Sequence, residues 1–167
     1  NDAPVLDATA SPTLLGINED LAAPVKNNTS NSTLVSTLLA GVSDVDKSAS
    51  KGIAIVGTNT TEGTLFYYNS AASTWHQVSG AADNNALLLL SNDRVYWQPA
   101  ANKNGTVSDA FTFRAWDVSD KVKSYNYRVF SNDTATTEIY TNTDTVSVTV
   151  TAVNDAPTLS TTTKALT

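Results

Sequence analysis

The segment 145–151 shows the strictest pattern in the chain, because Val alternates with Thr or Ser along its whole length. Val146, Val148 and Val150 occupy one set of alternate positions, and hydroxyl side chains occupy the other. Successive side chains of a β-strand point to opposite faces, so this period of two predicts a strand with one apolar and one solvated face. We therefore expect the valine face to pack against a second layer of the fold.

A second alternating segment lies at 110–116, where Phe111 and Phe113 share one face. Asn-Gly, Glu-Gly and Ser-Gly turn signals separate several other short apolar runs. Residues 81–90 and 34–39 could each form one or two helical turns, which is too little to set the fold class. Many short strands with regular turns predict an all-β protein, a two-sheet β-sandwich. We expect the further strands near 12–17, 33–40, 53–57, 64–69, 74–78, 94–98 and 124–130.

The composition excludes several classes of protein. The chain has 10 Lys and Arg against 16 Asp and Glu, a net charge of −6, so its surface repels a phosphate backbone and we expect no nucleic-acid partner. It contains no Cys, which excludes disulfides and thiolate metal sites. No run of about 18 apolar residues is present, so we expect no membrane insertion. A low charged fraction of 16%, with Thr, Ser and Asn as the polar residues, is typical of extracellular β-proteins.

The two ends of the chain carry nearly the same motif. Residues 1–6 read Asn-Asp-Ala-Pro-Val-Leu and residues 154–159 read Asn-Asp-Ala-Pro-Thr-Leu, so five of six positions match at an offset of 153. Coincidence is the alternative, because these residue types are common in loops. We interpret 1–153 as one module, and 154–167 as a linker and the start of the next repeat. The chain would then be part of a longer protein whose modules follow one another end to end.

Acidic residues gather at the ends of expected strands and in turns. In a sandwich such ends can converge at one pole, where clustered carboxylates repel each other unless one is protonated or a cation neutralises them. Calcium takes 6–8 oxygen ligands from carboxylates, amide side chains and backbone carbonyls. The alternative is that these residues only form turns and keep the surface soluble. The clusters are Glu19 with Asp20, Asp44 with Asp46, Asp117 with Asp120, and Asn154 with Asp155.

A series of short motifs occurs in an order that covers most of 1–157. They are Asn-Glu-Asp at 18–20, Val-Ser-Asp-Val-Asp at 42–46, Pro-Ala-Ala-Asn-Lys-Asn-Gly-Thr at 99–106, Phe-Thr-Phe-Arg-Ala-Trp-Asp at 111–117 and Val-Asn-Asp-Ala-Pro at 153–157. In this order they resemble the bacterial cadherin-like or immunoglobulin-like tandem repeats of large RTX-type surface adhesins.

The resemblance implies an immunoglobulin- or cadherin-like β-sandwich with extended loops, on the bacterial cell surface, stiffened by Ca²⁺ and acting in cell adhesion. Its partners would be neighbouring modules of the same chain. Motif positions imply metal ligands at one pole and at the junctions with the next and previous modules. The implied ligands are Glu19, Asp44, Asp46 and Asp117 at one pole, Asn154 and Asp155 at the next junction, and Asn1 and Asp2 at the previous one.

The unit is longer than the plain spacer repeats of such proteins, with its surplus at 58–92 and 118–143. Insertions at sandwich loops often carry binding sites, so the alternative function is a ligand-binding domain that recognises a peptide or glycan on a host or partner cell. Trp75, Tyr67 and Tyr125 are the candidate contact residues, and ordinary packing is the competing interpretation for each.

Nothing in the sequence indicates an enzyme. The chain has one His, His76, with no evident Ser or Asp motif partner, no Cys nucleophile and no phosphate-binding glycine loop. A carboxylate pair can hydrolyse a glycoside, but the acidic residues here are expected at the module ends rather than in a cleft. We therefore expect a binding or structural module without catalytic activity.

Overall fold

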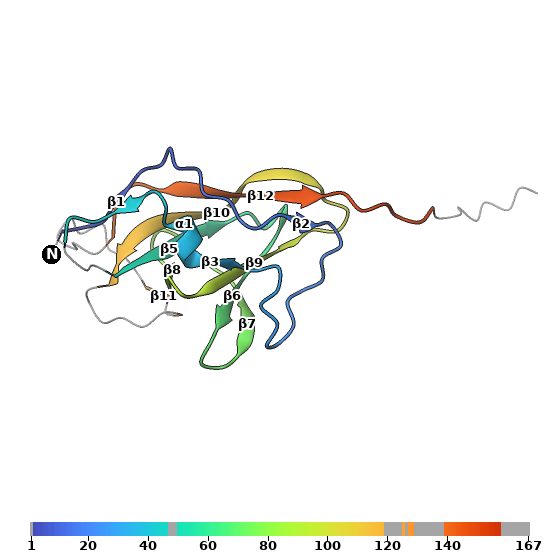
Figure 1. The fold of residues 1–167 in the computed structure, drawn as a ribbon, viewed down its shortest axis with the longest axis horizontal. Helices are drawn as coiled ribbons and strands as arrows, with labels where there is room; N and C mark the ends of the chain where they lie inside the picture. The colour runs from blue at the N-terminus through green and yellow to red at the C-terminus, as the bar shows by residue number, and fades with distance from the viewer. Residues whose placement is uncertain (1, 47–49, 119–124, 126, 129–138, 158–167) are drawn as a thin grey trace, which may run out of the picture.

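The computed structural model describes residues 2–46, 50–118, 125, 127–128 and 139–157. Figure 1 shows that the regular elements of the described residues are strands, apart from one short helix. In chain order the elements are β1 (Val5–Leu6), β2 (Ile17–Asn18), β3 (Thr33–Leu34), α1 (Val35–Leu38), β4 (Val42–Ser43), β5 (Lys51–Thr58), β6 (Gly63–Asn69), β7 (Thr74–Gln77), β8 (Ala86–Leu90), β9 (Arg94–Pro99), β10 (Gly105–Asp117), β11 (Tyr127–Arg128) and β12 (Asp144–Thr151).

The strands form two main layers. A six-stranded sheet has the order β11-β8-β5-β10-β12-β2, and a four-stranded sheet has the order β3-β9-β6-β7. A small pair, β1-β4, adds a third piece of sheet. The prediction of an all-β sandwich is confirmed.

The two alternating segments of the sequence pair with each other and line the core. β10 and β12 are antiparallel, with Phe111 opposite Val146. Directly opposed residues of two strands face the same side of a sheet, so the phenylalanine and valine faces are one surface. Val148 and Val150 extend this surface and are buried with it. The period of two read from the sequence therefore identifies the inner face of the larger sheet.

The segment 81–90 differs from its expected helical turns, because Ala86–Leu90 is strand β8. Leu87 and Leu89 face the main core, whereas Leu88 belongs to a second cluster with Trp116 on the opposite face of the sheet. Both faces of β8 are buried, so its sequence is continuously apolar rather than alternating. Such a run does not distinguish a strand from a buried helix.

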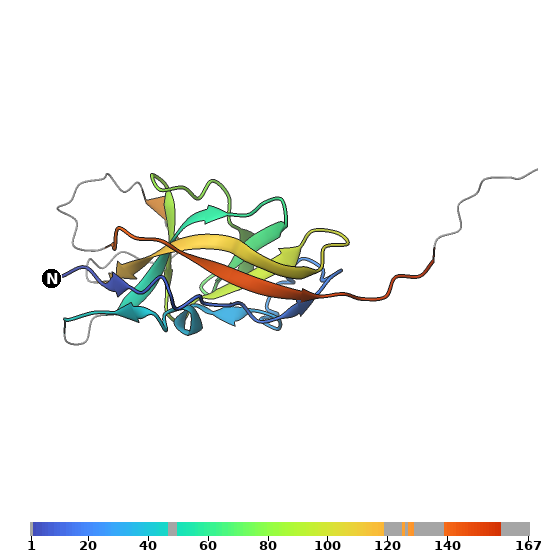
Figure 2. The ribbon, with the colours of Figure 1, turned by 90° about the horizontal axis from the view of Figure 1, so that it is seen from above.

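The sandwich has two poles, which Figures 1 and 2 show at opposite ends of the long axis. The entry pole holds the start of the chain, β1, β4 and the last residues of β10. At the exit pole β12 ends, beside the parallel strand β2, and the chain leaves the sandwich. The described residues of the repeated motif, 2–6 and 154–157, thus lie at opposite poles.

Two tryptophans occupy space that a glycine leaves free on the neighbouring strand. Trp116 lies opposite Gly52, where an added Cβ would come within 2.7 Å of the ring and 2.5 Å of the Leu89 carbonyl oxygen. Trp97 covers Gly63 in the other sheet in the same way, with its ring atoms 2.6 Å from an added Cβ. Close packing of both large rings therefore depends on these glycines.

We predict that Gly52→Ala lowers the free energy of unfolding by about 1–3 kcal/mol, because the Trp116 ring or the β8 backbone must move. Gly57→Ala, on the same strand, is the matched control, since its Cβ would make ordinary contacts at 3.7 Å and 3.8 Å. Urea unfolding of both variants checks this prediction. Equal stability of the two variants would contradict it.

Candidate functional site at the entry pole

Asp117 is the last residue of β10, and the alternation of that strand determines where its carboxylate lies. Phe113 and Ala115 face the core, so Asp117, two residues later, faces the same side at the end of the sandwich. Its exposure is 1%, and neither carboxylate oxygen has a hydrogen-bond partner among the described residues. Because burying a charge without a partner is costly, this side chain requires a compensating group.

Asp44 and Asp46 lie in the loop after β4. Asp44 accepts the Asp46 backbone N–H on Oδ1 at 2.8 Å, while its Oδ2 is buried without a partner. Asp46 Oδ2 accepts the backbone N–H of Asp2 at 2.8 Å, which ties the start of the chain to this loop. Asn1 lies outside the described residues. The structure therefore brings Asp2, Asp44 and Asp46 together.

Lys51 links this loop to Asp117. Its Cα lies opposite that of Asp117 on the neighbouring strand β5, and its ammonium donates to the Val42 carbonyl at 2.9 Å. Val42 precedes Asp44 by two residues, so the loop and Asp117 lie at the same pole. Lys51 and Asp117 form no ion pair, since the salt bridges among the described residues join Lys103 to Glu62 and Arg114 to Asp83.

Asp117 contributes two buried oxygens to the entry pole and Asp44 contributes one, and none of them has a hydrogen-bond partner among the residues that the structure describes. Within the described ranges, no three or more His, Cys, Asp or Glu side chains are arranged to hold a metal ion. Asp120, the expected companion of Asp117, lies outside these ranges. Calcium also accepts backbone carbonyls and water as ligands. The two carboxylates would therefore supply only some of the ligands of a calcium site.

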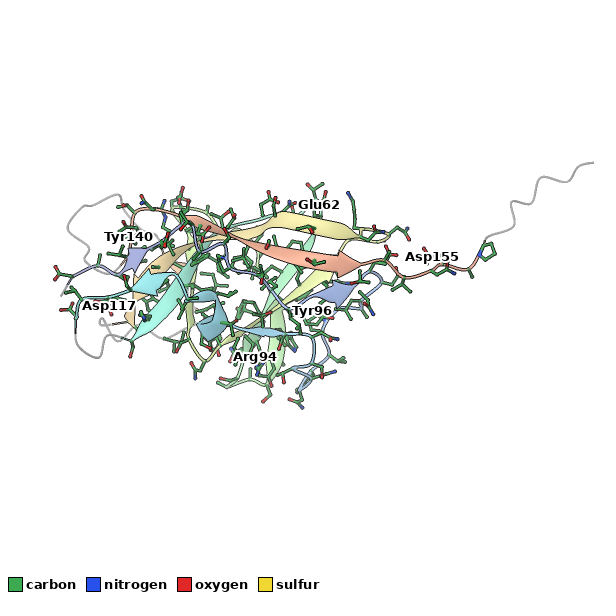
Figure 3. All side chains as sticks on the ribbon, turned by 45° about the horizontal axis from the view of Figure 1, so that its top comes forward. Glu62, Arg94, Tyr96, Asp117, Tyr140 and Asp155 are labelled. Carbon is green, nitrogen blue, oxygen red and sulfur yellow. The ribbon has the colours of Figure 1, made fainter. Side chains whose placement is uncertain are left out.

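The expectation that Glu19 shares a pole with Asp44, Asp46 and Asp117 is wrong. Glu19 follows β2 and donates its backbone N–H to the Thr151 carbonyl at 2.9 Å, at the exit end of β12. About eleven residues of extended strand, roughly 35 Å, separate that end from Asp117. Asn154 and Asp155 are exposed just beyond it; Figure 3 places Asp155 and Asp117 at opposite ends.

Glu19 is 5% exposed, and protein donors satisfy both of its carboxylate oxygens. Oε2 accepts the Asn104 side-chain N–H at 2.9 Å, and Oε1 accepts the Val153 backbone N–H at 2.6 Å. The bond from Asn104, and then that from Val153, lowers the pKa of Glu19 from its ordinary value, because both donors stabilise the ionised form. Glu19 is therefore held as a carboxylate.

A buried acid that sequence reasoning missed lies at the start of β12. Asp144 is opposite Phe113 and faces the same inner side; it is 8% exposed, and its Oδ2 is buried without a partner. Burial raises the pKa of Asp144, the backbone N–H of Thr145 opposes that rise, and the charge of Asp7 adds to it. The alternation of this strand could have revealed it, because Asp144 lies two residues before Val146 and therefore points to the same face.

Trp75, the first aromatic candidate, lies on the outer face of the four-stranded sheet and contacts other residues of the protein. Its indole N–H donates to the Asn28 carbonyl at 2.9 Å. Its ring centroid lies 5.0 Å from that of Tyr68 and 5.6 Å from that of Tyr96. These contacts give Trp75 a packing role.

Tyr67 and Tyr125 stack on each other with ring centroids 5.6 Å apart. Tyr67 is buried and also stacks on His76 at 5.4 Å. The hydroxyl of Tyr125 donates to Asp93 at 2.7 Å. Each of these candidate contact residues therefore has partners inside the protein.

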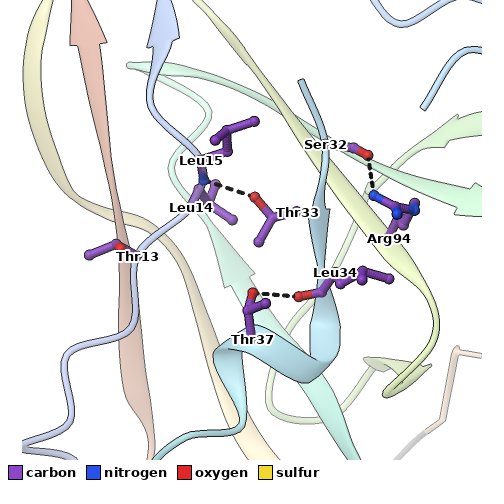
Figure 4. A pocket seen from close by; sticks show the side chains of 8 residues that line it. All are labelled: Thr13, Leu14, Leu15, Ser32, Thr33, Leu34, Thr37 and Arg94. Atoms are coloured by element: carbon purple, nitrogen blue, oxygen red, sulfur yellow. Dashed lines mark hydrogen bonds between the residues drawn. The ribbon is translucent and has the colours of Figure 1, made fainter. Parts of the chain in front are cut away.

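A shallow groove of about 400 Å³ lies between the segment 13–15 and β3, as Figure 4 shows. The Leu15 backbone N–H donates to Thr33 Oγ1 at 2.9 Å across it, and Arg94 donates to Ser32 Oγ at 3.0 Å at one end. The complete lining is Thr13, Leu14, Leu15, Ser32, Thr33, Leu34, Thr37 and Arg94.

Comparison with known proteins found no matching family model, no similar curated protein and no similar solved structure. Among the described residues, no helix is long and apolar enough to cross a membrane.

We predict that Asp144→Asn is more stable than the wild type at pH 7. A carboxyl whose pKa is raised on folding stabilises the fold while it is protonated, and that contribution is lost as the pH rises from the unfolded value of 3.8 through the folded one. Asn removes the buried charge, so the advantage of the variant should shrink towards zero below pH 3.8. Urea unfolding in chelator across this pH range checks the prediction; an equal loss of stability at every pH would refute it.

Proposed function

We propose that this chain is a calcium-dependent β-sandwich module of a bacterial surface adhesin, acting as a stiffened extender in cell adhesion. The observation that carries the proposal is Asp117, whose carboxylate is buried at the entry pole with no hydrogen-bond partner on either oxygen from the part of the chain that the structure describes. The motif order that resembles RTX-type adhesin repeats supports the same conclusion.

The donor set at the entry pole fits a hard cation. Asp117 would supply two carboxylate oxygens and Asp44 its free Oδ2, with backbone carbonyls and water as further ligands. Bound calcium would compensate the buried charge of Asp117. Asp46 would hold the start of the chain next to the ion, since its Oδ2 already accepts the backbone N–H of Asp2. In this way calcium would couple the loop after β4 and the start of the chain to the end of β10.

The extender role follows from the two poles. The chain enters at one end of the long axis and leaves at the other, so successive copies would lie end to end (Figure 2). Neighbouring modules of the same chain are the proposed partners. Extracellular modules bind calcium with dissociation constants of about 10⁻⁴–10⁻³ M, which suits a site assembled from few carboxylates at the cell surface.

The alternative, a ligand-binding domain for a peptide or glycan, gains no support from its candidate residues. Trp75, Tyr67 and Tyr125 each make contacts within the protein. We therefore prefer the extender role.

We predict that calcium at about 100 times its dissociation constant raises the free energy of unfolding by about 2.7 kcal/mol relative to chelator. For a domain of this size that corresponds to a rise of roughly 5–10 °C in Tm. Asp117→Asn should abolish this rise, while in chelator it should be at least as stable as the wild type, because it removes a buried charge. Scanning calorimetry in calcium and in chelator measures both effects.

Asp109→Asn is the matched control, because it removes an exposed carboxylate from the same strand, far from the entry pole. It should keep the full response to calcium. A wild type that does not respond to calcium, or an Asp117→Asn variant that responds normally, would exclude calcium binding by Asp117.

A further inference from the structure

We propose that Glu19 is a metal-free latch that fixes the direction in which the chain leaves the module. Its carboxylate binds the backbone of the outgoing chain and the turn before β10 at the same time. This inference does not depend on calcium binding at the entry pole.

Three segments meet at the latch. The parallel pair β2–β12 places Asn18 beside Thr151, and the backbone N–H of Glu19 continues the ladder by donating to Thr151. The Glu19 side chain then reaches the Val153 N–H at 2.6 Å, two residues beyond the end of β12. Its other oxygen accepts the Asn104 amide at 2.9 Å.

The turn that carries Asn104 is held in place on both sides. Lys103 donates its backbone N–H to the Ala100 carbonyl at 3.1 Å, and its ammonium pairs with Glu62 at 3.1 Å. Gly105 follows with a φ of +100°, which glycine adopts readily, and pairs with Val150. The amide of Asn104 therefore has a fixed position beside β12, from which it orients the Glu19 carboxylate.

The two bonds to Glu19 are strong ones. Hydrogen bonds to an ionised acceptor are roughly twice as strong as neutral ones, and Glu19 is 5% exposed, so water competes weakly. A cation bound by Glu19 would have to displace a donor or share an oxygen with it. Glu19 thus differs from Asp117, whose oxygens receive no hydrogen bond within the described ranges.

The latch extends the part of the outgoing chain that is bound to the sandwich. The ladder of β12 ends at Thr151, but Glu19 also holds Val153, so Asn154 is the first linker residue without a hydrogen bond to the described part of the sandwich. Figures 1 and 2 show the chain leaving along the long axis of the sandwich. The first part of the outgoing chain is therefore directed along that axis even without a cation.

Amide hydrogen exchange of the full chain in chelator, followed by NMR, tests the latch. We expect the Val153 amide to be protected in the wild type. Glu19→Ala should make its exchange at least about tenfold faster, the effect of losing one charge-assisted bond. The amides of Val146 and Val148 should remain protected, which shows that the sandwich is intact.

Asp20→Asn is the matched control, because it removes the exposed carboxylate next to Glu19, and Asn is tolerated at the positive φ of 59° found there. It should leave exchange at Val153 unchanged. If Glu19→Ala fails to fold, Asn104→Ala replaces it; that variant keeps the carboxylate but frees its orientation, and should accelerate exchange at Val153 by a smaller factor.

Two results would overturn the latch. The first is a Val153 amide that exchanges freely in wild-type chain without metal. The second is protection that appears only when calcium is added, which would make Glu19 part of a metal site. Neither result bears on the Asp117 experiment, so failure of the latch and failure of the calcium proposal can be told apart.

Discussion

The pairing of β10 with β5 on one side and β12 on the other supports both the core and the candidate site. Phe111 and Phe113 on β10 fill the space between the layers, and their phase along the strand also decides where Asp117 lies. Asp117, four residues after Phe113, also points inward, but it lies at the end of the sandwich and carries a carboxylate. A strand that buries its aromatic residues must bury this acid too, unless its register or twist changes.

The sequence predicts the parts of this arrangement that depend on local pattern. Val146, Val148 and Val150 alternate because one face of β12 is buried and the other is solvated, and such alternation is visible without knowing which strand lies beside it. β8 was harder to recognise, because Trp116 covers its outer face and removes the alternation. Burial by a distant residue leaves no local signal.

The candidate site was predicted only in part, for a similar reason. Asp117 ends β10, Asp44 and Asp46 follow β4, and the structure brings these ends to one pole. Glu19 has the same sequence character but lies at the other pole, because β2 runs parallel to β12, a relation between segments more than 130 residues apart. Asp144 was missed because a single acid before an alternating run looks like part of a turn.

The parallel pair of β2 and β12 also has a mechanical consequence. The chain enters and leaves at opposite ends of the long axis, so tension applied to its two ends would act along β12 rather than across it. β12 is bonded to β10 on one side and to β2 on the other, so such a force must shear both ladders at once instead of opening one bond at a time. β12 is thereby held on both edges, with six residue pairs to β10 and two to β2, while the pair β1–β4 at the other end joins only two residues of each strand.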